Sequence, residues 1–166
     1  VISPQPSQVR MPTMTMPTAQ VDFTGVVDAK VYNVTSEISD SVLIDCGNPR
    51  HSLCTRKWCE DLFRKRGETV PYEYVHPEIF TFGGGKQFSS NVTVKIPVNI
   101  GQFKGNFKFF VLDDSSGIPP LLSKTALQVM KGVIDAEKST LYFKGLKRVV
   151  RLRESSSGHW IMPLGN

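Results

Sequence analysis

The chain has 166 residues, a length that suits one domain and is short for two independent cores. Hydrophobic residues make up 40% and charged residues 21%, which is the composition of an ordinary globular protein. No stretch approaches the about 20 apolar residues of a membrane-spanning helix, so no membrane association is expected. The net charge is +5, and the bases are concentrated at residues 56–66, 104–108 and 144–153.

The three cysteines, Cys46, Cys54 and Cys59, are odd in number and close together. A small secreted disulfide scaffold usually has an even and widely spread set, so the pattern predicts a reducing, intracellular location. With His51 the cysteines form the spacing Cys-x4-His-x2-Cys-x4-Cys, which matches no standard zinc motif. We therefore predict no metal and no cofactor.

Residues 1–20 hold four prolines among polar residues, which predicts a flexible linker or arm. The start at Val1 suggests a fragment cut from a longer chain. Residues 21–166 then form the predicted folded domain. Strand-forming valines open it, and the apolar run 41–44 predicts a short buried strand.

This run stops abruptly at Asp45-Cys46-Gly47, a strong turn signal that places a carboxylate at the tip of the strand. Apolar residues at helical spacing predict a helix over residues 53–65. Residues 71–80 read as extended, and the glycine-rich loop that follows consists of Phe82, Gly83, Gly84 and Gly85.

Alternating apolar residues over 92–98 and 107–111 predict a β-hairpin. Ser123 is expected to cap a short helix that Gly132 ends. Three further short strands are predicted, at residues 133–135, 140–143 and 149–152. Many short strands with two short helices predict a mainly-β, barrel-like domain.

The order of these pieces resembles the retropepsin family of aspartic proteases, and most closely the protease segment of copia-type retrotransposon polyproteins. The matching stretches share short apolar or glycine-rich motifs in the family's order, at residues 42–47, 80–85, 120–127, 133–143 and 157–164. The resemblance covers residues 21–164 and implies a closed acid-protease barrel. It also implies a location in the cytoplasm or in a virus-like particle.

The resemblance implies a homodimeric endopeptidase that cleaves its own polyprotein. Asp45 would be the catalytic residue, in a turn formed with Cys46 and Gly47, and Phe82 to Gly85 would belong to a mobile flap over the peptide. Leu121 and Leu122 would support the active-site floor or an apolar subsite. A monomeric enzyme of this class needs two Asp-x-Gly turns, and the chain offers one, so the pair of aspartates requires twofold symmetry.

Three residues depart from the family pattern: Cys46 replaces the usual Thr or Ser, Asn48 a small apolar residue, and Ser123 a Gly. A thiol hydrogen-bonds weakly, so bonds across the dimer would weaken. The alternative is thus an inactive retropepsin-like domain used for dimerisation or peptide binding. A third interpretation is a nucleic-acid-binding barrel using residues 144–153, which predicts steep salt dependence and exposed aromatic residues on a sheet face. For these bases we prefer a solvated surface.

Overall fold

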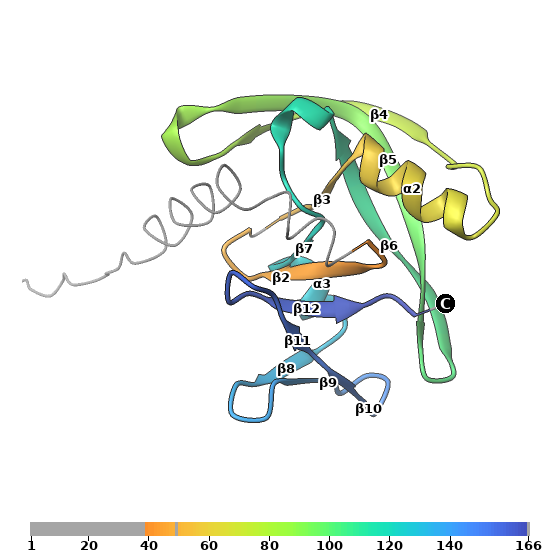
Figure 1. The fold of residues 1–166 in the computed structure, drawn as a ribbon, viewed down its shortest axis with the longest axis vertical. Helices are drawn as coiled ribbons and strands as arrows, with labels where there is room; N and C mark the ends of the chain where they lie inside the picture. Colours follow the sequence, from red (N-terminus) through yellow and green to blue (C-terminus); the bar gives the residue numbers. More distant parts are fainter. Residues whose placement is uncertain (1–38, 49, 166) are drawn as a thin grey trace, which may run out of the picture.

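The computed structural model of the chain describes residues 39–48 and 50–165, and its secondary structure is mainly β (Figure 1). The strands are β2 (Ser41–Asp45), β3 (Ser52–Thr55), β4 (Glu73–Thr81), β5 (Gln87–Ile100), β6 (Phe103–Leu112), β7 (Leu121–Ser123), β8 (Gly132–Asp135), β9 (Thr140–Phe143), β10 (Arg148–Arg151), β11 (Arg153–Glu154) and β12 (Trp160–Pro163). The helices are α2 (Arg56–Lys65) and α3 (Lys124–Val129), with 3₁₀ turns at Gly83–Gly85 and Asp114–Ser116. The mainly-β prediction is confirmed.

Eight strands form one sheet in the order β11-β12-β2-β7-β3-β6-β5-β4, and β10-β9-β8 form a second. Strand β2 is central: it pairs parallel with β7 and antiparallel with β12. Over the described part of the chain β11 and β4 are edges, so the hydrogen bonding gives an open sheet. The expected closure into a barrel is absent from this strand order, because closure requires the two edge strands to pair.

Strand β2 is apolar throughout because both of its faces are covered. Val42 and Ile44 belong to the larger core cluster, together with Phe109 and Leu122. Leu43 points to the opposite face and packs in a second cluster. A strand buried on both sides reads as a continuous apolar run, which explains why this strand was correctly predicted.

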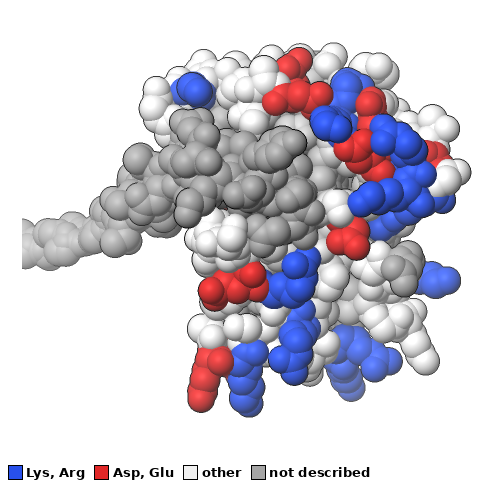
Figure 2. All heavy atoms as spheres, in the orientation of Figure 1, with Lys and Arg blue, Asp and Glu red and all other residues white. Residues whose placement is uncertain are grey.

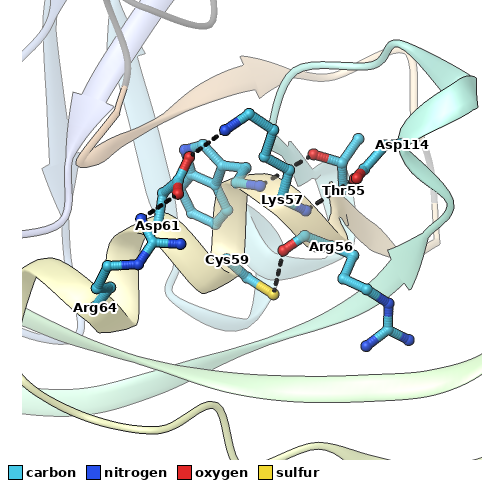
Figure 3. Close-up of polar contacts among 8 residues, drawn as sticks. Thr55, Arg56, Lys57, Cys59, Asp61, Arg64 and Asp114 are labelled. Carbon is cyan, nitrogen blue, oxygen red and sulfur yellow. Dashed lines mark hydrogen bonds and ion pairs between the residues drawn. The ribbon is translucent and has the colours of Figure 1, made fainter.

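Helix α2 begins later than predicted, because residues 52–55 form strand β3 instead. Leu53 and Cys54 pair in register with residues of β6, and this pairing outweighs their helical spacing. The Thr55 side chain then caps the helix by accepting from the Trp58 N–H at 3.3 Å. The Lys57 N–H donates to Asp114 Oδ1 at 2.8 Å, which joins the helix start to the loop after β6 (Figure 3).

The second predicted helix is confirmed as α3, with the Ser123 side chain accepting from the Ala126 N–H at 3.2 Å. It ends at Val129, however, and Gly132 begins β8 rather than closing the helix. The predicted arm at residues 1–20 and the valine-rich segment 21–34 lie outside the described residues. Neither helix in the described part of the chain is long and apolar enough to cross a membrane.

Candidate active site

Asp45 is the last residue of β2 and lies in register with Ser123, the last residue of β7. Two parallel strands therefore end side by side at this carboxylate. The Gly47 N–H donates to Asp45 Oδ1 at 3.0 Å, and the Asn48 N–H donates to the Asp45 carbonyl oxygen at 3.2 Å. The turn holds the carboxylate in a fixed orientation through its own backbone.

Burial raises the pKa of the Asp45 carboxyl above its ordinary value. Backbone hydrogen bonds from Gly47 and Asn48 oppose this rise, and so does the positive charge of His159. Asp45 therefore retains its proton to a higher pH than a solvated aspartate. Perturbed carboxyl groups of this kind are typical of acid–base catalysis.

Cys46 is exposed, and it is the only one of the three cysteines that is not buried. Although the residue is exposed, the thiol is partly desolvated, and this together with the negative charge of Asp45 raises its pKa, against the effect of the positive charge of Lys124. The thiol therefore stays protonated near neutral pH and remains a weak hydrogen-bond donor.

The other two departures from the family pattern have local partners that the sequence did not reveal. The Asn48 side-chain amide donates to the His51 carbonyl at 2.6 Å, and the Asn48 carbonyl accepts from the Lys124 N–H at 2.9 Å. The Ser123 N–H donates to the buried Ser52 hydroxyl at 3.0 Å. These bonds fasten the turn after Asp45 to β3 and to the start of α3.

Leu121 and Leu122 pair in register with Leu43 and Ile44, directly beside the strand that carries Asp45. Both leucines are buried, and they face the two opposite core clusters. In this chain they brace the strand from within the core and present no surface to a ligand.

The predicted flap residues form the tip of the hairpin between β4 and β5, which arches over the top of the molecule in Figure 1. The Phe82 ring packs against Phe88, with ring centroids 5.8 Å apart. Gly84 and Gly85 have φ angles of 80° and 78°, which L-residues with side chains rarely adopt. The hairpin tip is thus shaped by backbone conformation, since a Cβ atom at either glycine would meet open space.

His51 joins the Asp45 side of the molecule to the base of this hairpin. Its Nε2 lies 3.1 Å from Glu78 Oε1 on β4, and its ring packs edge-on against Phe110 at 4.9 Å and Phe80 at 6.0 Å. Arg50 adds a longer contact to Glu78, at 3.8 Å. Sequence reasoning considered His51 only as a metal ligand, and its separation of 27 positions from Glu78 gave no signal of the pairing.

A cleft of about 650 Å³ lies beside this contact. Its walls come from the segment after the Asp45 turn, from β4, from β6 and from α3. Basic side chains from three of these walls, Arg50, His76 and Lys108, line it together with apolar residues. Asp45 itself does not line the cleft, but its register partner Ser123 does.

The remaining described aspartates have structural partners of their own. Asp113 accepts from the Ser115 N–H at 2.9 Å, and Asp114 caps α2. Asp61 pairs with Lys57 and Arg64 on the helix surface (Figure 3). Asp40 accepts from the hydroxyl of the next residue, Ser41, and Asp135 accepts from the Lys138 N–H. Asp45 differs from them in its place at the end of a buried strand and in the burial that raises its pKa.

The cysteine and histidine residues considered as a zinc site do not come together in one group. Cys54 and Cys59 are buried, and Cys59 Sγ lies 3.5 Å from the Tyr72 hydroxyl. Within residues 39–48 and 50–165 no group of three or more His, Cys, Asp or Glu side chains is arranged to hold a metal ion.

Comparison with family models, with curated proteins and with solved structures gives no match to this chain. The assignment of function therefore depends on the residues and their geometry.

Proposed function

We propose that the chain is an aspartic endopeptidase of the retroviral type, with a retropepsin-like fold, that acts as a homodimer on extended segments of a polyprotein. The observation that carries the proposal is the Asp45 turn. A carboxylate sits at the end of a buried strand, its backbone amides are directed to it, and burial raises its pKa.

The chemistry needs a second carboxylate facing the first. The sequence has a single Asp-x-Gly turn, so in this proposal the second carboxylate is supplied by Asp45 of a twofold-related copy. Two carboxylates about 3 Å apart share one proton, since both cannot ionise. The ionised member takes a proton from water as the oxygen attacks the scissile carbonyl, and the protonated member donates to the carbonyl oxygen. Collapse of the resulting diol breaks the C–N bond, and the amine leaves with a proton.

The hairpin and the cleft support an extended peptide as the substrate. The hairpin tip, residues 82–86, exposes Gly84 and Gly85, whose backbone can lie close to a bound chain. The His51–Glu78 contact ties the hairpin base to the segment that follows Asp45. A peptide held under the hairpin would place side chains in the adjacent cleft, where Lys108 favours an acidic residue.

The test is proteolysis of a mixed library of unstructured peptides by the 166-residue chain, at mildly acidic and at neutral pH, read by mass spectrometry. We expect cleavage by the wild type and a loss on the order of 10⁴-fold with Asp45→Asn. Asp61→Asn is the matched control, because Asp61 lies on the surface of α2 and should leave cleavage intact. The rate should also rise faster than linearly with protein concentration where the dimer is partly dissociated.

Equal cleavage by wild type and Asp45→Asn would assign the activity to a contaminant. No cleavage by a sample shown to be folded and dimeric by sedimentation would reject the enzyme and favour the second candidate, a domain kept for dimerisation or peptide binding. The observation that favours this candidate is Cys46, whose protonated thiol replaces a hydroxyl. If the thiol weakens the dimer, Cys46→Thr should strengthen dimerisation and raise the cleavage rate.

A further inference from the structure

The three-stranded sheet β10-β9-β8 carries an exposed row of apolar side chains. Val133 on β8 and Val149 on β10 both lie in register with Tyr142 on β9. The exposed fraction is 43% for Val133, 64% for Val149 and 38% for Tyr142. The neighbours of Tyr142 along β9, Leu141 and Phe143, are fully buried, so the sheet has one core face and one outer face.

Basic side chains surround this row. Four exposed cations belong to this face of the sheet or to its turns: Lys131, Lys144, Lys147 and Arg151. None of the four has an ion pair within the part of the chain that the structure describes. Residues 131–153 contain seven Lys or Arg and two Asp or Glu, an excess of five that equals the net charge of the whole chain.

The row runs across the three strands, and the cations lie on both sides of it along the strands. On one side, Arg151 pairs with Thr140, two residues before Tyr142, and alternation along the strands places both on the outer face. On the other side, the Lys144 N–H donates to the Lys131 carbonyl at 3.2 Å, which extends the pairing one step beyond β8 and β9. Figure 2 shows Lys and Arg gathered at this lower end of the molecule, where Figure 1 places β8 to β10.

We propose that this outer face of β8–β10 binds single-stranded nucleic acid. The phosphates would contact the basic side chains, and one base would stack on Tyr142 between the two valines. This is the combination that single-strand binding requires: a cationic surface that follows the backbone and an aromatic side chain that any base can cover. A duplex hides the faces of its bases, so stacking on Tyr142 favours a single strand. The proposal does not depend on protease activity, because Asp45 lies in the other sheet.

The test uses the 166-residue chain and a fluorescently labelled 12-nucleotide oligouridylate, with affinity measured by anisotropy over a range of salt concentrations. Tyr142→Ala should weaken binding roughly 5- to 150-fold, the loss expected for one stacked base. Tyr142→Phe should retain it. Tyr74→Ala is the matched control, since Tyr74 is also an exposed tyrosine but lies on β4.

The contribution of the basic side chains is measured separately, through the salt dependence of the affinity. Each of Lys144→Gln and Arg151→Gln should reduce the slope of log affinity against log salt by about 0.7, the value for one phosphate contact of a single strand. Lys65→Gln, an exposed lysine on α2, should leave the slope unchanged. Melting temperatures equal to the wild type would show that the variants fold.

Three results would overturn the proposal. The first is Tyr142→Ala binding as well as the wild type, which would mean that the face attracts any polyanion. The second is affinity for duplex or heparin equal to that for the single strand. The third is preferential binding to phosphatidylserine vesicles, which would make the face a membrane-surface patch.

Discussion

His51 Nε2 and Glu78 Oε1 lie 3.1 Å apart and connect the segment after the Asp45 turn to the base of the β4–β5 hairpin. Both side chains are about one-third exposed, and the imidazole also packs on Phe80 and Phe110. The contact therefore combines a polar bond with aromatic packing. It makes the hairpin's position depend on the loop beside the candidate catalytic residue.

A double-mutant cycle with His51→Gln and Glu78→Gln should give a coupling energy of about 0.5–1 kcal/mol, measured by chemical denaturation. Amides of β4 should exchange with solvent faster in either single variant, since the hairpin base is released. The matched control is the exposed pair Arg56–Glu60 on α2, at 4.0 Å, where coupling should be at most about 0.5 kcal/mol. A His51–Glu78 coupling near zero would mean that the two groups do not act together in solution.

Asp45→Asn should raise the thermal stability of the protein at neutral pH. The folded-state pKa of Asp45 lies above its ordinary value of 3.8, so the folded protein favours the protonated carboxyl. Stability from this group is then fully present below pH 3.8 and falls as the pH rises through the folded-state pKa. The asparagine variant avoids that fall, and its advantage in melting temperature should shrink towards zero in acid.

Asp61→Asn should instead lower the thermal stability at neutral pH, and it therefore serves as the comparison. Hydrogen bonds and charge interactions with Lys57 and Arg64 lower the pKa of Asp61, so its contribution is present at neutral pH and is lost as the pH falls through the folded-state pKa. Exposure limits the loss at neutral pH to about 0.5 kcal/mol. If both variants shift the melting temperature in the same direction, burial of Asp45 is not the cause.

Gly84→Ala should destabilise the protein by about 1–2 kcal/mol, because a left-handed backbone conformation is strained for alanine. The φ angle of Gly84 is 80°, and the added Cβ would touch nothing, so backbone strain is the sole cause. Gly145→Ala provides the control: its φ is not in the left-handed region, and its Cβ would lie 3.9 Å from the Met130 carbonyl oxygen. Equal unfolding free energies for the two variants would show that the hairpin tip adopts another conformation.

Ser52→Ala should cost about 1–3 kcal/mol of unfolding free energy, since it leaves the buried Ser123 N–H without its acceptor. Thr93→Val should instead raise the free energy of unfolding. Thr93 Oγ1 is buried and has no hydrogen-bond partner within the described residues, and valine keeps the shape of the side chain. Chemical denaturation of both variants tests the pair, and a neutral Ser52→Ala would mean that this bond does not hold the Asp45 turn.

The strand that ends at Asp45, the Ser123 cap and the β5–β6 hairpin were predictable because their signals are local. A buried strand needs a continuous apolar run, a helix needs a capping side chain, and a half-buried hairpin needs alternation. The candidate residue Asp45 followed from the same logic, since a turn directly after a buried strand exposes its first side chain.

The start of α2, the open strand order and the His51–Glu78 contact were decided by tertiary structure. Leu53 and Cys54 have helical spacing, but pairing with β6 satisfies their backbone groups in a strand. Asn48 and Ser123 are departures from a family pattern in the sequence, and in the fold they are hydrogen-bonded parts of one junction. The sequence by itself determined which segments are buried and where the chain turns, because those depend on near neighbours. Which distant segments meet depends on how the strands are ordered, and only the folded chain decided that.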